Sequence, residues 1–170
     1  MALLEILRFP DPRLRVKAKP VAASEINDAF RRMMDDMYET MYDANGVGLA
    51  ATQVGIHQRF FVMDVSEKRN QRICVINPEI ITVEGEKEDS EGCLSVGNGV
   101  YDKVKRAAKV TLRGMDLDGN TFELVAENLM AACVQHEIDH LNGMLFIDHL
   151  SRLKQERIRK KIEKNKRRDE

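Results

Sequence analysis

The stretch LMAACVQHEIDH, residues 129–140, joins an apolar run without charges to a group of histidine and acidic residues. The uncharged run predicts a helix that is buried on most sides, and we expect this helix to extend from about Glu127 to Leu141. Histidines at the end of a buried helix need partners, because an unpaired imidazole is costly to desolvate. The helix is therefore predicted to form the centre of the fold and to carry its polar site.

Length and composition predict one globular domain. The chain has 170 residues, of which 43% are hydrophobic and 32% charged, a balance that excludes a disordered chain. No run approaches the roughly 20 apolar residues of a membrane span, and the N-terminal stretch lacks a signal-peptide cleavage site. Three cysteines are too few for a disulfide framework in a domain of this size. We therefore expect a cytoplasmic protein without membrane association.

The pattern along the rest of the chain predicts an α+β fold. Apolar residues at three- and four-residue steps predict an amphipathic helix over residues 24–41, with Ser24 as its N-cap. Runs rich in Val, Ile and Phe predict short strands, at 59–65, 73–76, 79–86, 109–115 and 121–126. We expect antiparallel β-sheets around the buried central helix with its HExxH motif, plus an N-terminal and a C-terminal helix.

The sequence QHEIDH (135–140) has the spacing of a metal site. His136 and His140 are four residues apart, so on a helix their side chains lie one above the other and can converge on one ion. Glu137 lies about 100° around the helix from His136, within reach of a water bound to that ion. A bare HExxH match also occurs on surface helices, and the buried apolar run favours the metal interpretation.

A catalytic metal needs a third protein ligand. A third histidine at the spacing of the longer zinc-peptidase motif would fall on Phe146, and His149 is out of step. Upstream, Cys93 follows a glycine in EGCLS (91–95), a stretch too polar for a simple core strand. Its thiolate would complete a Cys-His-His set with one open position for water, which is the geometry of a hydrolytic site.

The glycine-rich stretch GVGLAATQVG (46–55) is the other unusual segment. Its glycines and paired alanines suit a backbone that approaches a ligand closely, and Gln53 is an uncharged donor for a developing oxyanion. Taken alone, the same glycines favour a flexible loop between a helix and a strand.

Together these three stretches resemble the peptide deformylase family, which removes the N-formyl group from newly made polypeptides. GVGLAATQ, EGCLS and QHEIDH stand in the order and spacing of that family. The resemblance extends from ILRFPDPRLR (6–15) through INPEI (76–80) to the C-terminal helix, and so covers nearly the whole chain.

The resemblance implies that Cys93, His136 and His140 bind one metal ion per chain. In bacterial members this metal is typically Fe²⁺, which Ni²⁺, Co²⁺ or Zn²⁺ can replace, and a thiolate with two imidazoles suits several of these metals. Metal-bound hydroxide then attacks the formyl carbon and releases formate, with Glu137 as general base and acid. The resemblance further implies that the Gln53 amide and the backbone N–H of Leu94 stabilise the tetrahedral oxygen.

The resemblance also implies the substrate contacts. A formyl-Met peptide would place its methionine side chain in an apolar pocket and pair its backbone like an added strand with Gly48 and Gly92. Members of the family build the methionine pocket near the positions of Val47, Ala132, Cys133 and His136. Cys133 is then a wall of the pocket rather than a ligand, because its neighbours in the helix are apolar.

Two further residues are interpreted structurally. Asp139 is expected either to pair with Arg106, which would orient the helix, or to be a solvated carboxylate. Gly143 is expected to end the helix in a left-handed conformation. The sequence departs from the family at GNG (97–99), where a proline usually follows EGCLSV and this chain is about one residue longer. We expect that difference to affect the affinity for substrates or inhibitors and to leave the metal ligands unchanged.

The C-terminal segment is strongly basic. Residues 152–168 contain ten lysines or arginines and two glutamates, a formal charge of +8 in a chain whose net charge is −1. We expect residues 1–150 to form the catalytic domain and residues 151–170 a basic helical extension of it, with Leu153, Ile158 and Ile162 on one face. A solvated helix is the ordinary interpretation, but the family resemblance implies that the helix at 151–168 docks on the ribosome near the exit tunnel. We expect a monomer.

Two other functions are compatible with these motifs. An HExxH peptidase that cleaves internal amide bonds would use the same metal site. A ribosome- or RNA-binding factor would use the basic helix and keep the metal as a structural element, although such a site normally has four protein ligands and no fourth adjoins these three.

Overall fold

The computed structural model describes residues 2–97 and 100–169. Four short 3₁₀ helices connect the main elements: η1 (Pro12–Arg15), η2 (Ala23–Glu25), η3 (Ala51–Val54) and η4 (Phe146–His149). The three α-helices are α1 (Asp28–Asp43), α2 (Asn128–Leu141) and α3 (Arg152–Asp169). The strands are β1 (Gly48–Ala50), β2 (Phe60–Met63), β3 (Ile73–Glu84), β4 (Lys87–Glu91), β5 (Asp102–Arg106), β6 (Lys109–Met115) and β7 (Thr121–Glu127).

The strands form two antiparallel sheets. The larger sheet has five strands in the order β1-β2-β3-β6-β7, and the smaller one pairs β4 with β5. The α+β class predicted from the sequence is confirmed. In the large sheet β1 pairs only with β2, so the other edge of β1 has no strand partner within the described part of the chain.

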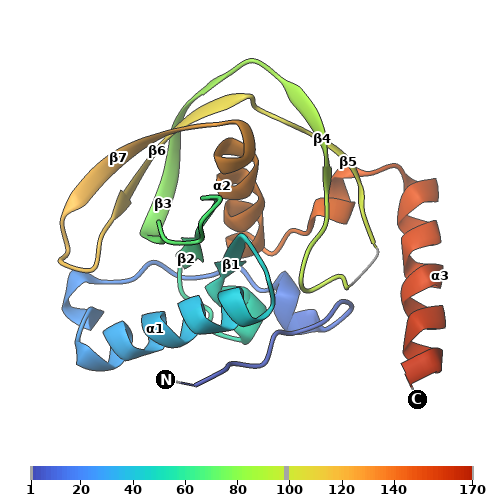
Figure 1. Cartoon of the computed structure of the whole chain (residues 1–170), viewed down its shortest axis with the longest axis horizontal. Helices are drawn as coiled ribbons and strands as arrows, with labels where there is room; N and C mark the ends of the chain where they lie inside the picture. Colours follow the sequence, from blue (N-terminus) through green and yellow to red (C-terminus); the bar gives the residue numbers. More distant parts are fainter. Residues whose placement is uncertain (1, 98–99, 170) are drawn as a thin grey trace.

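Helix α2 lies in the middle of the molecule, and strands of both sheets surround it (Figure 1). Its buried residues pack in one core cluster with residues of β1, β2, β3, β6 and β7. A second cluster packs α1 against β2 on the opposite face of the large sheet. The helix expected at about 127–141 is thus confirmed, and its burial follows from its uncharged run.

Helix α1 begins later than predicted. Ser24 lies in η2, and α1 begins at Asp28 after an N-cap at Asn27, whose side chain accepts a hydrogen bond of 2.9 Å from the N–H of Phe30. The prediction of Ser24 as the N-cap was therefore wrong. Asparagine and serine are both good N-caps, and only the tertiary path of residues 20–27 selects between them.

Three differences concern the strands. The runs at 73–76 and 79–86 are one strand, β3, with a register shift near Asn77, which has φ 52°. The pair β4–β5 was not predicted, because its sequences are mostly charged and carry little hydrophobic alternation. Strand β1 was interpreted as part of a loop, since a stretch of three residues with a glycine gives almost no pattern.

Helix α3 forms the outer edge of the molecule, far from α1 (Figure 1). Ile158 is buried and Ile162 is half-buried against a small cluster that includes Val104 and Leu150, whereas Leu153 is exposed. No helix in the described residues is both long enough and apolar enough to cross a membrane.

Candidate active site

Three potential metal ligands meet at the C-terminal half of α2. The Nε2 atoms of His136 and His140 are 3.2 Å apart, and the Sγ atom of Cys93 lies 3.3 Å from Nε2 of His140. All three ligating atoms lie within 4.8 Å of one another. The spacing of four residues on α2 stacks the two imidazoles, and the chain after β4 brings the thiol to them.

A tight turn after β4 places Cys93. The backbone N–H groups of Val96 and Gly97 both donate to the Cys93 carbonyl at 3.1 Å. The turn is anchored from the N-terminal segment, where the N–H of Phe9 donates to the carbonyl of Ser95 at 2.7 Å. Ser95 itself is fully buried. The thiol position thus depends on residues about 85 positions apart in the sequence.

The donor set fits a divalent transition metal. A thiolate and two imidazole nitrogens within this separation would hold one such ion and would leave a coordination position for water. Two buried polar atoms beside the set, Glu137 Oε1 and His140 Nδ1, have no hydrogen-bond partner among the described residues. An unpaired carboxylate oxygen this deep in the protein is costly unless a ligand of the site satisfies it.

Glu137 is almost completely buried, with 3% of its surface exposed. Burial raises the pKa of this carboxyl group to about 7, with smaller effects from the charges of His136 and Glu91. Its Oε2 lies so close to Gly48 that a Cβ atom at this glycine would be only 2.5 Å away. A carboxyl group with a pKa near neutrality is suited to take up and release a proton.

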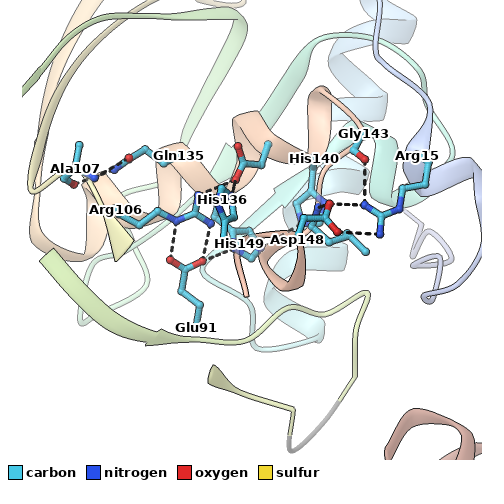
Figure 2. A network of polar contacts seen from close by, with 12 residues as sticks. Arg15, Glu91, Arg106, Ala107, Gln135, His136, His140, Gly143, Asp148 and His149 are labelled. Atoms are coloured by element: carbon cyan, nitrogen blue, oxygen red, sulfur yellow. Dashed lines mark hydrogen bonds and ion pairs between the residues drawn. The ribbon is translucent and has the colours of Figure 1, made fainter. Parts of the chain in front are cut away.

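His136 is oriented by a buried ion-pair network (Figure 2). Its Nδ1 lies 2.9 Å from Oε1 of Glu91, which turns Nε2 toward the other two ligands. Arg106 donates two hydrogen bonds of 2.8 Å to the Glu91 carboxylate. Although burial raises the pKa of Glu91, the hydrogen bonds from Arg106 and His136 outweigh it and lower the pKa to about 2.

The same arginine connects the network to the next turn of α2. Arg106 Nη1 donates to Oδ2 of Asp139 at 2.6 Å, which decides between the two interpretations of Asp139 in favour of the ion pair. His149 Nε2 lies 2.8 Å from the same oxygen. Its place in the network was missed, because the sequence shows only that His149 is out of step as a metal ligand.

The helix ends as predicted. Gly143 has φ 77°, and its N–H donates to the His140 carbonyl at 3.0 Å. A Cβ atom at this position would lie 2.4 Å from the carbonyl oxygen of Arg15, so the left-handed turn and the close approach both require glycine.

A cleft of about 300 Å³ opens in front of the three ligands. Most of its lining comes from residues 45–53, from the end of β4 with the turn after it, and from one face of α2. The predicted site residues that line the cleft are Val47, Gly48, Gln53, Gly92, Cys93, Leu94, Ala132, Cys133, His136 and Glu137. His140 is buried behind them with 1% of its surface exposed.

The polar groups of the cleft are oriented by their own hydrogen bonds. Gln53 accepts from the N–H of Ala50 at 2.9 Å through Oε1, so its Nε2 points to the turn after β4. That nitrogen is 3.1 Å from Ser95 Oγ and 3.6 Å from Cys93 Sγ. Cys133 lies outside the ligand cluster, and burial raises the pKa of its thiol well above the ordinary value.

Several lining residues were not anticipated from the sequence, among them Leu129 and Tyr101. Leu129 and Tyr101 are both largely exposed at the cleft, and the ring of Tyr101 packs on Gly92 so closely that a Cβ atom there would be 2.5 Å away. No local sequence pattern predicts that either residue lies at the cleft. Of the segment GNG, Asn98 and Gly99 lie outside the described residues, and Gly97 has φ 113°.

Comparison with known proteins agrees with this site. The sequence model of the family described as polypeptide deformylase matches residues 3–156. The peptide deformylase of Azotobacter vinelandii is 57% identical over 168 residues, which are 98% of each chain. The crystal structure of a peptide deformylase from Legionella pneumophila has a TM-score of 0.93 at 49% identity and covers 99% of this chain and 98% of that one. A peptide deformylase from Ehrlichia chaffeensis in complex with actinonin has a TM-score of 0.91 at 37% identity, covering 98% of this chain and 99% of that chain.

Proposed function

This chain belongs to the polypeptide deformylase family of hydrolases, and from that premise we propose that it hydrolyses the N-formyl group of formyl-Met peptides at the Cys93, His136 and His140 centre. The observation that carries this assignment of residues is the convergence of the three ligating atoms beside the unpaired carboxylate of Glu137, at the end of an open cleft.

Cys93, His136 and His140 hold one metal ion per chain. We propose Fe²⁺, since a thiolate with two imidazoles accepts this ion and also Ni²⁺, Co²⁺ or Zn²⁺. When bound, the metal supplies Lewis acidity that activates a water molecule and polarises the formyl oxygen. Glu91 and Arg106 keep His136 in the tautomer that presents Nε2 to this centre.

Glu137 is the proton carrier. Its carboxylate takes a proton from the attacking water and delivers it to the amine that leaves as the new peptide N-terminus. Gly48 and Cys133 pack closely against this side chain, which is 3% exposed, so little of it is in contact with bulk water. General acid–base catalysis of this kind contributes about 10²- to 10⁴-fold.

Two donors stabilise the oxygen of the tetrahedral state. The Gln53 amide points to the turn that contains Cys93, and the N–H of Leu94 lies in the same turn. Each donor is expected to contribute about 3 kcal/mol to the transition state. The Gln53 side chain is buried and held by its own hydrogen bonds, and the Leu94 N–H belongs to the backbone, so little reorganisation is needed when the charge develops.

The substrate peptide pairs with the free edge of β1. Gly48 at the start of this strand and Gly92 across the cleft offer backbone groups, and Val47, Ala132 and Cys133 surround the methionine side chain. The formyl carbon carries only hydrogen besides nitrogen and oxygen, so it can approach the ligands closely. A bulkier acyl group is obstructed, and acetyl-Met peptides are expected to be poor substrates.

The direct test measures formate released from formyl-Met-Ala-Ser by protein purified without oxygen, with metal content quantified. The wild type is compared with Glu137→Ala, and acetyl-Met-Ala-Ser and an unformylated protein serve as substrate controls. Release of formate from the formyl peptide alone, lost in a variant that still holds one metal per chain, supports the assignment. Cleavage of the unformylated protein would instead indicate an internal peptidase.

We further propose that α3, which extends the catalytic domain of residues 1–150 as the segment 151–170, docks on the ribosome near the exit tunnel. Exposed cations cover most of α3, whereas Ile158 and Ile162 face the body of the protein. Such a surface suits a phosphate backbone. We propose that the protein is a monomer, so that no second copy covers α3, and that it lies in the cytoplasm, where the ribosome can reach this helix.

Truncation after Leu150 would also remove the buried Ile158, so a charge variant tests docking more cleanly. Replacing Arg157, Arg159 and Lys160 with glutamine is expected to weaken salt-dependent ribosome binding and to spare hydrolysis of formyl-Met-Ala-Ser. The same change at the exposed Lys17, Lys19 and Lys68 is the matched control. Equal ribosome binding by both variants would refute the docking role.

A further inference from the structure

The cleft segment that precedes β1 is held from outside by a neighbouring loop. The N–H of Asp64, at the end of β2, donates to the carbonyl of Val47 at 2.8 Å. The guanidinium of Arg69 reaches the carbonyl of Gly46 through Nη2 and the carbonyl of Asp64 through Nη1, the latter at 2.6 Å. Two successive carbonyls of the cleft segment are therefore bound by one loop, residues 64–72.

This loop is built around a buried carboxylate. Asp64 is fully buried, and it accepts hydrogen bonds from the hydroxyl of Tyr42 at 2.6 Å and from the N–H and hydroxyl of Ser66 at 2.9 and 2.5 Å. The N–H of Gln71 adds a further bond of 3.1 Å. A carboxylate with this many donors fixes the conformation of the loop and with it the origin of the Arg69 side chain.

Arg69 itself has an uncommon backbone conformation. Its φ of 56° lies in the left-handed region, which a long side chain adopts at some cost. The half-buried guanidinium lies 5.0 Å from the centre of the Tyr42 ring and so packs on α1 while it binds Gly46. A residue held in a costly conformation, with its guanidinium fixed by Asp64 and Tyr42 and bound to the Gly46 carbonyl, is suited to hold the cleft segment.

On its other side, toward α2, the cleft segment has little space in which to move. Gly48 packs against Glu137 and Cys133 so tightly that no side chain atom fits between them. Gly46 and Val47 also line the cleft. A shift of the segment outward would separate Gly48 from the peptide, and a shift inward would collide with Glu137.

We propose that Arg69 is a positioning residue that holds Gly46 to Gly48 at the separation where β1 pairs with the backbone of a bound peptide. This inference rests on the function proposed above. Arg69 acts through the carbonyl of Gly46 and does not touch the reacting atoms, so its loss affects the binding of an extended peptide more than the hydrolytic step.

The test compares Arg69→Met with Arg72→Met. Methionine keeps an unbranched side chain and removes the guanidinium with its hydrogen-bond donors and its contact with Tyr42. Arg72 is the matched control, because it belongs to the same loop but lies over the ring of Tyr38, 4.5 Å from its centre. Both metal-loaded variants are assayed on formyl-Met-Ala-Ser and on formyl-Met amide, with thermal unfolding and metal content measured in parallel.

Arg69→Met is expected to raise KM for formyl-Met-Ala-Ser about tenfold with kcat changed less than about twofold, and to have a smaller effect on formyl-Met amide, which has no following peptide to pair. Arg72→Met is expected to match the wild type. Arg69→Lys, which retains one donor, is expected to be intermediate, and it replaces the methionine variant if that protein does not fold.

Equal kinetics for the Arg69 and Arg72 variants would overturn the inference. So would a loss in kcat of the same size on both substrates, which is the result of a general structural role. If the wild type releases no formate, the proposed function fails and this inference fails with it. If the wild type is active and Arg69→Met has the same kinetics, the proposed function stands and only this inference fails.

Discussion

Helices α2 and α3 are similar in length, at 14 and 18 residues, but the fold uses them in opposite ways. Helix α2 carries its ionisable residues into the interior, where Glu137 and His140 are almost completely covered. Helix α3 keeps its charges in water and touches the protein mainly through Ile158 and Ile162. In α2 water is excluded, so its charged side chains contribute strongly to stability and function. In α3 the charges are solvated and contribute little, so its stability depends on the apolar contacts.

The largest effect on stability is expected from replacing Arg106, whose guanidinium binds Asp139 of α2 and Glu91. Arg106→Met leaves Glu91 and Asp139 buried without their partner and is expected to cost about 3 to 5 kcal/mol of unfolding free energy. Metal affinity is expected to fall about 10- to 100-fold, because Glu91 then holds His136 less well. Denaturant unfolding and a metal-competition titration measure the two effects. A change below about 1 kcal/mol would show that α2 does not depend on this network.

The second effect tests the burial of Glu137 in the metal-free protein. Its pKa is raised to about 7, so the folded state favours the protonated carboxyl, and stability falls as the pH rises from the ordinary value through about 7. Glutamine does not ionise, so Glu137→Gln is expected to abolish this fall in stability with rising pH. The variant is expected to match the wild type below about pH 4 and to exceed it by on the order of 3 kcal/mol above pH 8.

The control for that prediction lies on α3. Glu156 is exposed, so Glu156→Gln is expected to leave the dependence of stability on pH unchanged. Denaturant unfolding of the metal-free proteins between pH 4 and 8.5 measures both variants. Parallel curves for Glu137→Gln and the wild type would mean that the carboxyl group is solvated in the metal-free protein.

A smaller effect is expected at the apolar contact of α3. Ile158→Ala removes the one buried side chain among the described side chains of α3 and is expected to cost about 2 kcal/mol, mainly as local opening of α3. Hydrogen exchange of α3 amides reports this opening, and hydrolysis of a short formyl peptide is expected to persist. Leu153→Ala, at an exposed position of the same helix, is the control. Equal exchange in the two variants would show that α3 is held by other contacts.

The smallest effect is expected at the surface ion pair of α3. Lys154 lies 3.3 Å from Asp102, and its side chain is 47% exposed. Lys154→Met is expected to change the unfolding free energy by less than about 1 kcal/mol, and this change is expected to shrink further as added salt screens the ion pair. A cost comparable to that of Arg106→Met, measured by the same denaturant titration, would abolish the contrast between the two helices.

The centre of the site was the most predictable part of the molecule. His136, Glu137 and His140 lie on one helix, so their geometry follows from the helical repeat, and the uncharged run before them indicates burial. The role of Asp139 was left between two interpretations, because the partner comes from β5, which the sequence did not predict. The start of α1 was misplaced for a similar reason, since two residues had equal capping ability.

What the sequence by itself determined are the local features: a buried helix with metal-ligand spacing, a glycine where that helix must end, a basic terminal helix with isoleucines on one face, and motifs that resemble one family. These depend on residues within a few positions of one another. Only the tertiary structure decided that Arg106 and His149 join Asp139, that Tyr101 covers Gly92, and that Arg69 holds Gly46. These contacts join residues up to 33 positions apart, and no local periodicity records which distant backbone a long side chain will reach.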